Sequence, residues 1–226
     1  MFDGKRALLL DMNGTFMFGE DRFGPTEDFS RHYLSIGGTL PEREINRIIR
    51  GAYEYLEVRY PDEGYRHSFP SLESAVLEVA QIALGRRELE RIIQTFAFHE
   101  LGVIPNEYVL ALHELGRRFT LAAVVDIWAP KGPWLAAFER AGISALFSAA
   151  SFSSDHGVVK PSRKPFLRVL NQLGISGSQA LVIGDSVRRD LGGAKRAGID
   201  CILVGRAEHS DALMSFDNLL AFCSAI

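Results

Sequence analysis

The sequence predicts an α/β fold: a parallel sheet covered by helices, with an all-helical segment inserted after the first strand. From about residue 105 onward, short apolar runs alternate with segments of helical periodicity, which is the pattern of a parallel sheet wrapped by helices. Between about residues 16 and 104, helical periodicity recurs with Pro or Gly at the breaks and without a convincing strand. The insertion is therefore expected to be entirely helical.

The elements follow from apolar runs and turn residues along the chain. The expected strands cover residues 6–11, 120–125, 146–148, 179–183 and 200–204. The helices expected around them cover residues 106–116, 133–141, 165–173, 187–197 and 211–222. Gly142, Gly174 and Gly198 each follow one of these helices, as C-terminal cap glycines do. The inserted helices are expected at residues 25–36, 41–60, 70–84 and 86–101.

Composition excludes several classes of protein. The 226 residues are 47% hydrophobic and 23% charged, and the formal net charge is -3, as in an ordinary globular protein. A basic stripe, a membrane span and a signal peptide are all absent from the sequence. Two cysteines do not make a disulfide framework. We therefore expect a cytoplasmic protein, a monomer or homodimer, without a nucleic-acid or membrane partner.

Three acids and a lysine occupy predicted strand-to-helix turns. Asp11 ends the first strand, and Asp185 follows the apolar run of residues 180–184, with Asp190 five residues later. Lys160 precedes a helical stretch. Open α/β sheets place their chemistry at such strand ends, and these residue types are the parts of a magnesium-assisted phosphoryl-transfer site.

These motifs resemble those of the haloacid dehalogenase-like (HAD) superfamily, in the group with a helical cap inserted after the first motif. The resemblance covers nearly the whole chain, and the order and spacing of the motifs are specific. It implies a Rossmann-like core formed by residues 1–15 and 105–226 and a helical cap domain formed by residues 16–104. Asp11 and Asp185 would then lie on adjacent parallel strands, with their carboxylates within about 5 Å of each other.

The resemblance also implies roles for individual residues. Asp11 would be the nucleophile that becomes an aspartyl-phosphate. Mg²⁺ would be held by the Asp11 carboxylate, the Asn13 backbone carbonyl and Asp185, with Asp190 bound directly or through water. Lys160 would hold the phosphate and offset the carboxylate charges, and it is preferred to Lys164, four residues later. The turn at Gly14 and Thr15 would contact the substrate.

Two motifs depart from the family pattern. Asn13 stands where the family has the Asp that acts as general acid/base, so we group Asn13 with the catalytic residues Asp11 and Lys160. An amide donates a hydrogen bond but cannot supply a proton, and losing a general acid costs about 10²–10⁴ in rate. The second strand ends in Val125 and Asp126 where the family has a phosphate-binding Ser or Thr. Both residues are assigned to the substrate-binding region.

The leading hypothesis is a Mg²⁺-dependent phosphatase of a small phosphorylated metabolite. A 2-haloacid dehalogenase-type hydrolase uses the same nucleophile without needing an acid at position 13, and a catalytically weak binding or regulatory protein is the third interpretation. Asp126 would be unfavourable near an anionic substrate unless it points away or pairs with Lys131. Arg22 and Arg59 are candidates for reading a substrate anion.

Overall fold

The computed structural model describes residues 2–226 and contains a parallel sheet in the order β3-β2-β1-β4-β5-β6. The strands are β1 (Ala7–Leu10), β2 (Thr120–Val125), β3 (Phe147–Phe152), β4 (Ala180–Gly184), β5 (Asp200–Val204) and β6 (Met214–Phe216). β1 lies at the centre, where Leu8 is in register with Leu121 on one side and Leu181 on the other. The predicted α/β, Rossmann-like fold is confirmed.

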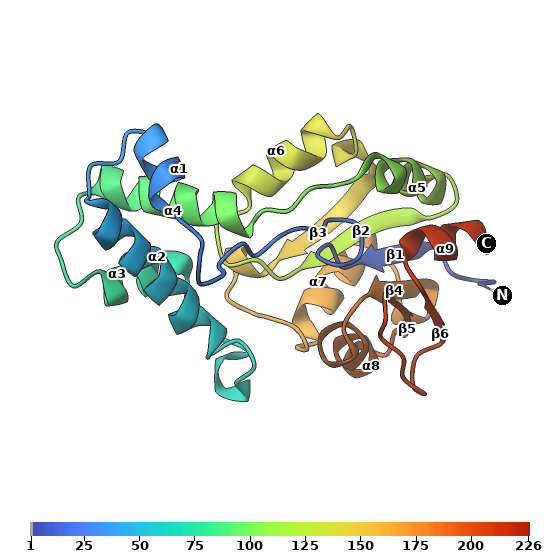
Figure 1. Cartoon of the computed structure of the whole chain (residues 1–226). Helices are drawn as coiled ribbons and strands as arrows, with labels where there is room; N and C mark the ends of the chain where they lie inside the picture. The colour runs from blue at the N-terminus through green and yellow to red at the C-terminus, as the bar shows by residue number, and fades with distance from the viewer. Residues whose placement is uncertain (1) are drawn as a thin grey trace.

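Helices cover both faces of this sheet (Figure 1). They are α5 (Asn106–Gly116), α6 (Gly132–Arg140), α7 (Lys164–Leu173), α8 (Gly192–Ala197) and α9 (Leu219–Ser224). Leu8 and Leu10 pack into the hydrophobic cluster beneath α5, α6 and α9, whereas Leu9 packs into the cluster beneath α7 and α8. Because both faces of the sheet are buried, its strands are continuously apolar rather than alternating.

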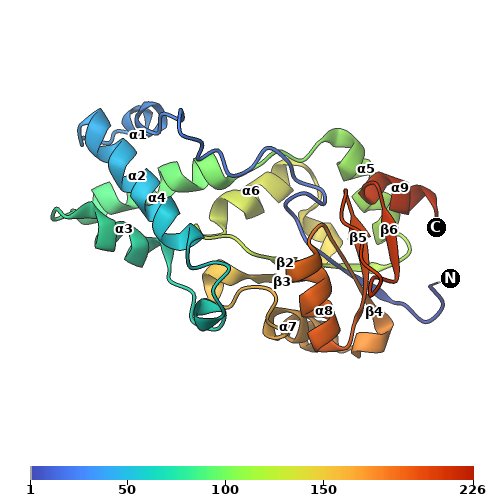
Figure 2. The ribbon, with the colours of Figure 1, turned by 60° about the horizontal axis from the view of Figure 1, so that its bottom comes forward.

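The chain between β1 and α5 forms a helical insert. Its helices are α1 (Ser30–Ser35), α2 (Glu42–Glu57), α3 (Leu72–Ala80) and α4 (Arg86–Glu100). The apolar stripe of α2, which the sequence assigns to packing within the bundle, is fully buried at Ile45, Ile48 and Ile49. Figures 1 and 2 place the insert beyond the end of the sheet that lies away from the two chain termini.

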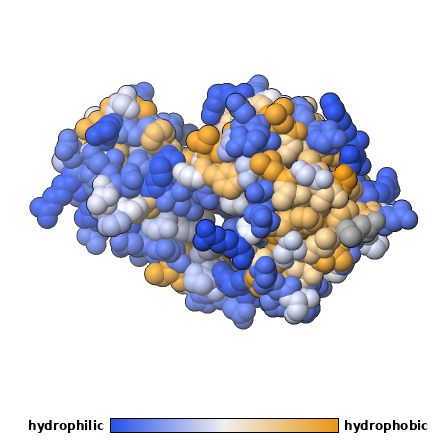
Figure 3. Space-filling view, turned by 45° about the vertical axis from the view of Figure 1, so that its right-hand side comes forward, coloured by the Kyte–Doolittle hydropathy of each residue, from blue (hydrophilic) through white to orange (hydrophobic). Residues whose placement is uncertain are grey.

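Arg22 holds together the two segments of chain that connect the insert to the sheet. Its guanidinium donates to the carbonyls of Gly19 (2.9 Å) and Leu101 (2.8 Å) and also to that of Phe98. Phe98 and Leu101 lie at the C-terminal end of α4, where helix carbonyls have no partner within the helix. In the space-filling view the two bodies meet along an indented edge, with mostly hydrophilic residues on the smaller body (Figure 3). Across residues 2–226, every helix is too short or too polar to pass through a lipid bilayer.

The structure differs from the expected elements mainly at the C-terminal end. The helix expected over residues 211–222 is replaced by β6 and the shorter helix α9. Met214–Phe216 pairs with β5, and the Asn218 side chain accepts from Ala221 N at 2.9 Å, which fixes the late start of α9. β3 extends to Phe152, beyond the expected residues 146–148, and α1 is shorter than the expected residues 25–36.

Candidate metal and phosphate site

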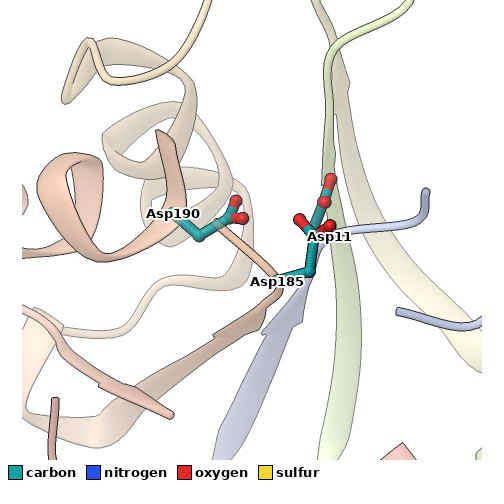
Figure 4. A group of neighbouring side chains, drawn as sticks. All are labelled: Asp11, Asp185 and Asp190. Atoms are coloured by element: carbon teal, nitrogen blue, oxygen red, sulfur yellow. The ribbon is translucent and has the colours of Figure 1, made fainter. Parts of the chain in front are cut away.

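Three acidic side chains meet at the carboxyl ends of β1 and β4. These strands are paired in parallel, and the direction of strand order reverses beside β1, the place where open α/β sheets bind ligands. Asp11 follows β1, Asp185 follows β4, and Asp190 lies in the helical turn beyond. One carboxylate oxygen of each lies within 4.8 Å of the others, in agreement with the bridging distance expected from the sequence. Figure 4 shows Asp190 extending from its turn toward the other two.

Lys160 joins two of these carboxylates. Its Nζ donates to Asp11 Oδ1 at 2.6 Å and to Asp190 Oδ1 at 2.7 Å, and the residue is only 1% exposed. Lys164, the competing lysine, lies exposed at the start of α7. The structure therefore brings together Asp11, Lys160 and Asp190, as the sequence predicts.

The carboxylates outnumber the cation among them, and their pKa values reflect this. Burial lowers the pKa of Lys160, but the neighbouring carboxylates outweigh burial and hold it above its usual value. Burial and then the charge of Asp11 raise the pKa of Asp190. The same two causes raise the pKa of Asp185. An additional cation would therefore stabilise the ionised cluster.

The oxygen atoms at this site fit Mg²⁺. Asp185 Oδ1 is buried and accepts no hydrogen bond from the residues that the structure describes. Asp190 is already engaged, because its Oδ1 accepts from Lys160 and its Oδ2 accepts from Ser186 N at 3.0 Å. Mg²⁺ prefers oxygen ligands and keeps several waters, so Asp11 and Asp185 are suited to direct contact and Asp190 to contact through water.

Gly14 is required by the close approach of Asp185. Its φ is +70°, a left-handed conformation that favours glycine. A Cβ atom built at this position would lie 2.4 Å from Asp185 Oδ2. The N–H groups of Gly14 and Thr15 already donate to backbone carbonyls, at 2.9 Å and 3.1 Å. The buried Thr15 Oγ1, which has no hydrogen-bond partner within residues 2–226, is therefore a free polar group of this turn.

Asn13 makes no hydrogen bond through its side-chain oxygen. Asn13 Oδ1 is buried without a partner among the described residues. An unpaired buried carbonyl is costly unless a ligand or water satisfies it. A hydrogen-bond donor on a ligand or a bound water would therefore satisfy this oxygen, in the residue two positions after Asp11.

The second strand presents Asp126, not Val125, to the site. Val125 is 1% exposed and belongs to the hydrophobic core. Asp126 Oδ2 accepts from the Lys160 backbone N–H at 2.9 Å and from the Tyr60 hydroxyl at 2.7 Å. The contact with Lys131 considered from the sequence does not form, because Lys131 pairs with Asp155 at 2.7 Å.

The insert and the turn after β4 contribute residues to this region that the sequence did not identify. Tyr60 reaches Asp126, and Arg189 Nη2 lies 3.5 Å from Asp185 Oδ1 while its guanidinium lies 6.0 Å from the Tyr60 ring centre. Glu20 Oε2 is buried without a partner in residues 2–226. Burial raises the pKa of Glu20, and the charges of Asp185 and Asp11 add to this effect. Of these residues, only Arg189 could have been found from the sequence, because it directly precedes Asp190.

Arg22 and Arg59, which the sequence suggests as contacts for a substrate anion, are both held by other interactions. Arg22 is held by the three carbonyls described above. Arg59 lies 3.5 Å above the Tyr55 ring and donates to the Tyr55 carbonyl at 2.7 Å. His156, the histidine nearest Lys160 in sequence, has Nε2 at 2.9 Å from Ser151 Oγ.

Glu100, at the end of α4, ties the insert to the loop after β2. The buried carboxylate accepts from Trp128 N at 2.6 Å and from Ala129 N at 2.8 Å. Burial raises the pKa of Glu100 to about 8, although the two backbone donors oppose the change.

Glu100 is expected to make stability depend on pH between about 5 and 8. In the unfolded chain its pKa has the ordinary value of 4.5, so within this interval the folded protein binds one more proton. The free energy of unfolding should fall with rising pH by up to about 1.4 kcal/mol per pH unit from this group and level off above pH 8. Urea unfolding from pH 5 to 9 measures the slope. Glu100→Gln should remove this slope component, and an identical slope in the variant would contradict the assignment.

Comparison with known proteins agrees with this geometry. A family model for haloacid dehalogenase-like hydrolases matches residues 5–198. A glyceraldehyde 3-phosphate phosphatase of Methanopyrus kandleri is 34% identical over 109 residues, which are 48% of this chain and 44% of the relative. The human phospholysine phosphohistidine inorganic pyrophosphate phosphatase is 28% identical over 180 residues, 76% of this chain and 60% of the relative. The chain thus spans less than two thirds of the length of these relatives.

Solved structures share the fold over nearly the whole chain. A 2-haloacid dehalogenase from Pseudomonas syringae pv. Tomato DC3000 has a TM-score of 0.68 at 20% identity, covering 97% of both chains. A HAD phosphatase from Thermococcus onnurineus has a TM-score of 0.59 at 19% identity and the same coverage. At such identities the likeness concerns the fold alone. With the family model covering most of its length, the chain belongs to the haloacid dehalogenase-like hydrolases.

Proposed function

We propose that the protein is a Mg²⁺-dependent phosphatase of a small phosphorylated metabolite and acts through an aspartyl-phosphate on Asp11. The observation that carries the proposal is the carboxylate cluster of Asp11, Asp185 and Asp190, bridged by Lys160 at the end of parallel strands. Relatives whose names describe phosphatases support the phosphate ester as the substrate class.

We also propose the division of the chain into a core of residues 1–15 and 105–226 and a cap of residues 16–104. The insert lies over the end of the sheet that carries the carboxylates, and its Tyr60 contacts Asp126 of the sheet side. Substrate selection would then come from cap residues around the crevice, as in other sites built at strand ends and closed by a second element.

In this mechanism the Asp11 carboxylate attacks phosphorus, and the bond to the leaving oxygen breaks. Asp11, the Asn13 carbonyl and Asp185, with Asp190 outside them, would hold Mg²⁺, which offsets the negative charge of the phosphate when bound. Lys160 supplies a fixed positive charge between two carboxylates. Asn13 can donate a hydrogen bond to the departing oxygen but cannot protonate it. Good leaving groups are therefore favoured, and hydrolysis of the aspartyl-phosphate is slow because no acid/base at position 13 activates water.

Asp185→Ala is expected to abolish most Mg²⁺ binding and Mg²⁺-stimulated hydrolysis of para-nitrophenyl phosphate. The substitution removes a carboxylate whose Oδ1 is buried and accepts no hydrogen bond from the described residues. Calorimetric titration with Mg²⁺ and a parallel activity assay measure both effects. Asp200→Ala is the matched control, since Asp200 lies at the start of β5 and pairs with Lys5 on the surface. Unchanged Mg²⁺ affinity in Asp185→Ala would contradict the proposed metal site.

Assays with other substrates separate the alternatives. Asn13 is compatible with carbon–halogen hydrolysis, which needs no acid at that position. Chloride release from a 2-haloacid that persists in a chelator would support dehalogenation instead. Ligand binding without turnover of an acyl phosphate or an aryl phosphate would support a binding or regulatory role.

A further inference from the structure

A second charged cavity lies next to Pro161, the residue after Lys160. Its volume is about 430 Å³, which is within the range of small-molecule sites. The insert contributes Arg66 and His67 to its wall, and the sheet side contributes Ser162, Arg163, Lys164 and Arg196. None of these side chains belongs to the carboxylate cluster.

The cavity concentrates positive charge in a chain whose net charge is negative. Four of its side chains are cationic, whereas the formal net charge of the whole protein is -3. Arg66 pairs with Glu63, whose side chain is 78% exposed, and a salt bridge with such an exposed partner is weak. Among residues 2–226, no carboxylate lies within 4.0 Å of the charged nitrogens of Arg163, Lys164 or Arg196. Apart from Arg66, the basic side chains of the cavity thus have no carboxylate within salt-bridge distance.

Ser162 is a buried polar residue of the cavity wall and is held by hydrogen bonds. Ser162 is 2% exposed, and its Oγ accepts from Lys164 N at 3.2 Å and lies 3.3 Å from His67 Nδ1. α7 begins at Lys164 and runs for ten residues, so the positive end of its dipole faces the same place as the cationic side chains. Ser162 therefore gives the cavity a buried, hydrogen-bonded polar group among the basic side chains.

Backbone hydrogen bonds join the two walls of the cavity. Val159 N donates to the Arg66 carbonyl at 3.1 Å, and Phe69 N donates to the Gly157 carbonyl at 2.8 Å. The wall from the insert is thereby attached to the loop that carries Lys160. A ligand contacting both walls would reinforce this attachment.

We propose that this cavity binds a small polyphosphate-type anion, such as pyrophosphate or a metabolite with more than one phosphoryl group. Arginine matches phosphate oxygens with paired hydrogen bonds, and lysine and a helix start add positive charge. The four positive charges around about 430 Å³ exceed the charge of about -2 that one phosphoryl group carries. The bound anion would link Arg66 of the insert with Arg163 and Arg196. This site does not depend on the proposed phosphatase activity.

Calorimetric titration with pyrophosphate, in a chelator and at fixed ionic strength, tests the proposal on the full chain. The double variant Arg163→Gln/Arg196→Gln should weaken binding about tenfold or more, since it removes two charge-assisted contacts. Both side chains are exposed, so folding should be unaffected. The matched control is Arg86→Gln/Arg117→Gln, which removes two exposed arginines from distant helices. Its affinity for pyrophosphate should equal that of the native protein.

Two further measurements make the outcome decisive. Asp11→Asn removes a negative charge from the carboxylate cluster, so it would tighten binding of an anion there and should leave binding in the cavity unchanged. Inorganic phosphate should bind at least tenfold more weakly than pyrophosphate. Equal weakening in the two double variants would mean that the loss of any two positive charges lowers the affinity for pyrophosphate, without a specific site in the cavity. A tenfold change in Asp11→Asn with none in the Arg163/Arg196 variant would assign binding to the cluster. Either result overturns the proposal.

Discussion

Asn13→Asp is expected to raise hydrolysis of alkyl phosphates by about 10²- to 10⁴-fold, the usual contribution of a general acid. The two side chains have nearly the same shape, and the Asn13 oxygen makes no hydrogen bond that would be lost. The new carboxyl would protonate the leaving oxygen and then activate water. The comparison is kcat/KM for an alkyl phosphate in the native and variant proteins.

Esters with good leaving groups provide an internal control, because their departing oxygen barely needs a proton. Hydrolysis of para-nitrophenyl phosphate should therefore rise less than that of the alkyl ester. Asn171→Asp, at an exposed position of α7, should change neither rate. Rapid-quench measurement with an acyl phosphate should show aspartyl-phosphate accumulating in the native protein. Absence of any gain in Asn13→Asp would indicate that the residues at the end of β2, and not position 13, limit turnover.

Lys160→Met is expected to lower the free energy of unfolding by about 3–5 kcal/mol, the usual cost of removing one partner of a buried ion pair. The substitution keeps most of the side-chain volume but leaves Asp11 and Asp190 facing each other without their shared cation. Urea unfolding at pH 7 measures the loss.

Mg²⁺ should compensate for part of this loss, because it binds the folded cluster and not the unfolded chain. The increase in stability on adding Mg²⁺ should be larger in Lys160→Met than in the native protein. Lys164→Met is the control, and as a substitution at an exposed position it should change stability by less than about 0.5 kcal/mol. A loss below about 1 kcal/mol in Lys160→Met would mean that the carboxylates are already neutralised by protons.

The parts of the site carried by strand ends could be predicted from the sequence. Asp11 and Asp185 directly follow apolar runs, and neighbouring parallel strands bring such residues to one edge. Lys160 was assigned through its motif, and its burial between two carboxylates agrees with that assignment. These contacts depend on local signals and on a regular sheet.

Contacts made by the helical insert could not be predicted in this way. Tyr60 meets Asp126 across 66 residues of sequence, and Glu100 meets the backbone of Trp128 and Ala129. Helical periodicity shows which face of a helix is buried but not which loop it contacts. The same limit applies to β6, where a three-residue strand replaced an expected helix because pairing with β5 outweighed local periodicity.

The crowding around two glycines has a consequence for how this site can change during evolution. A Cβ atom at position 14 would collide with Asp185, and one at position 184 would lie 2.3 Å from the Asp190 carboxyl carbon. Any side chain at either position would displace an acid, so neither glycine can be replaced without disturbing the site. Position 13 has no such barrier, since its side-chain oxygen touches no hydrogen-bond partner. An ancestral or descendant sequence can exchange acid for amide at position 13 and keep the same backbone, so the proton chemistry of this site can change while its three acids stay in place.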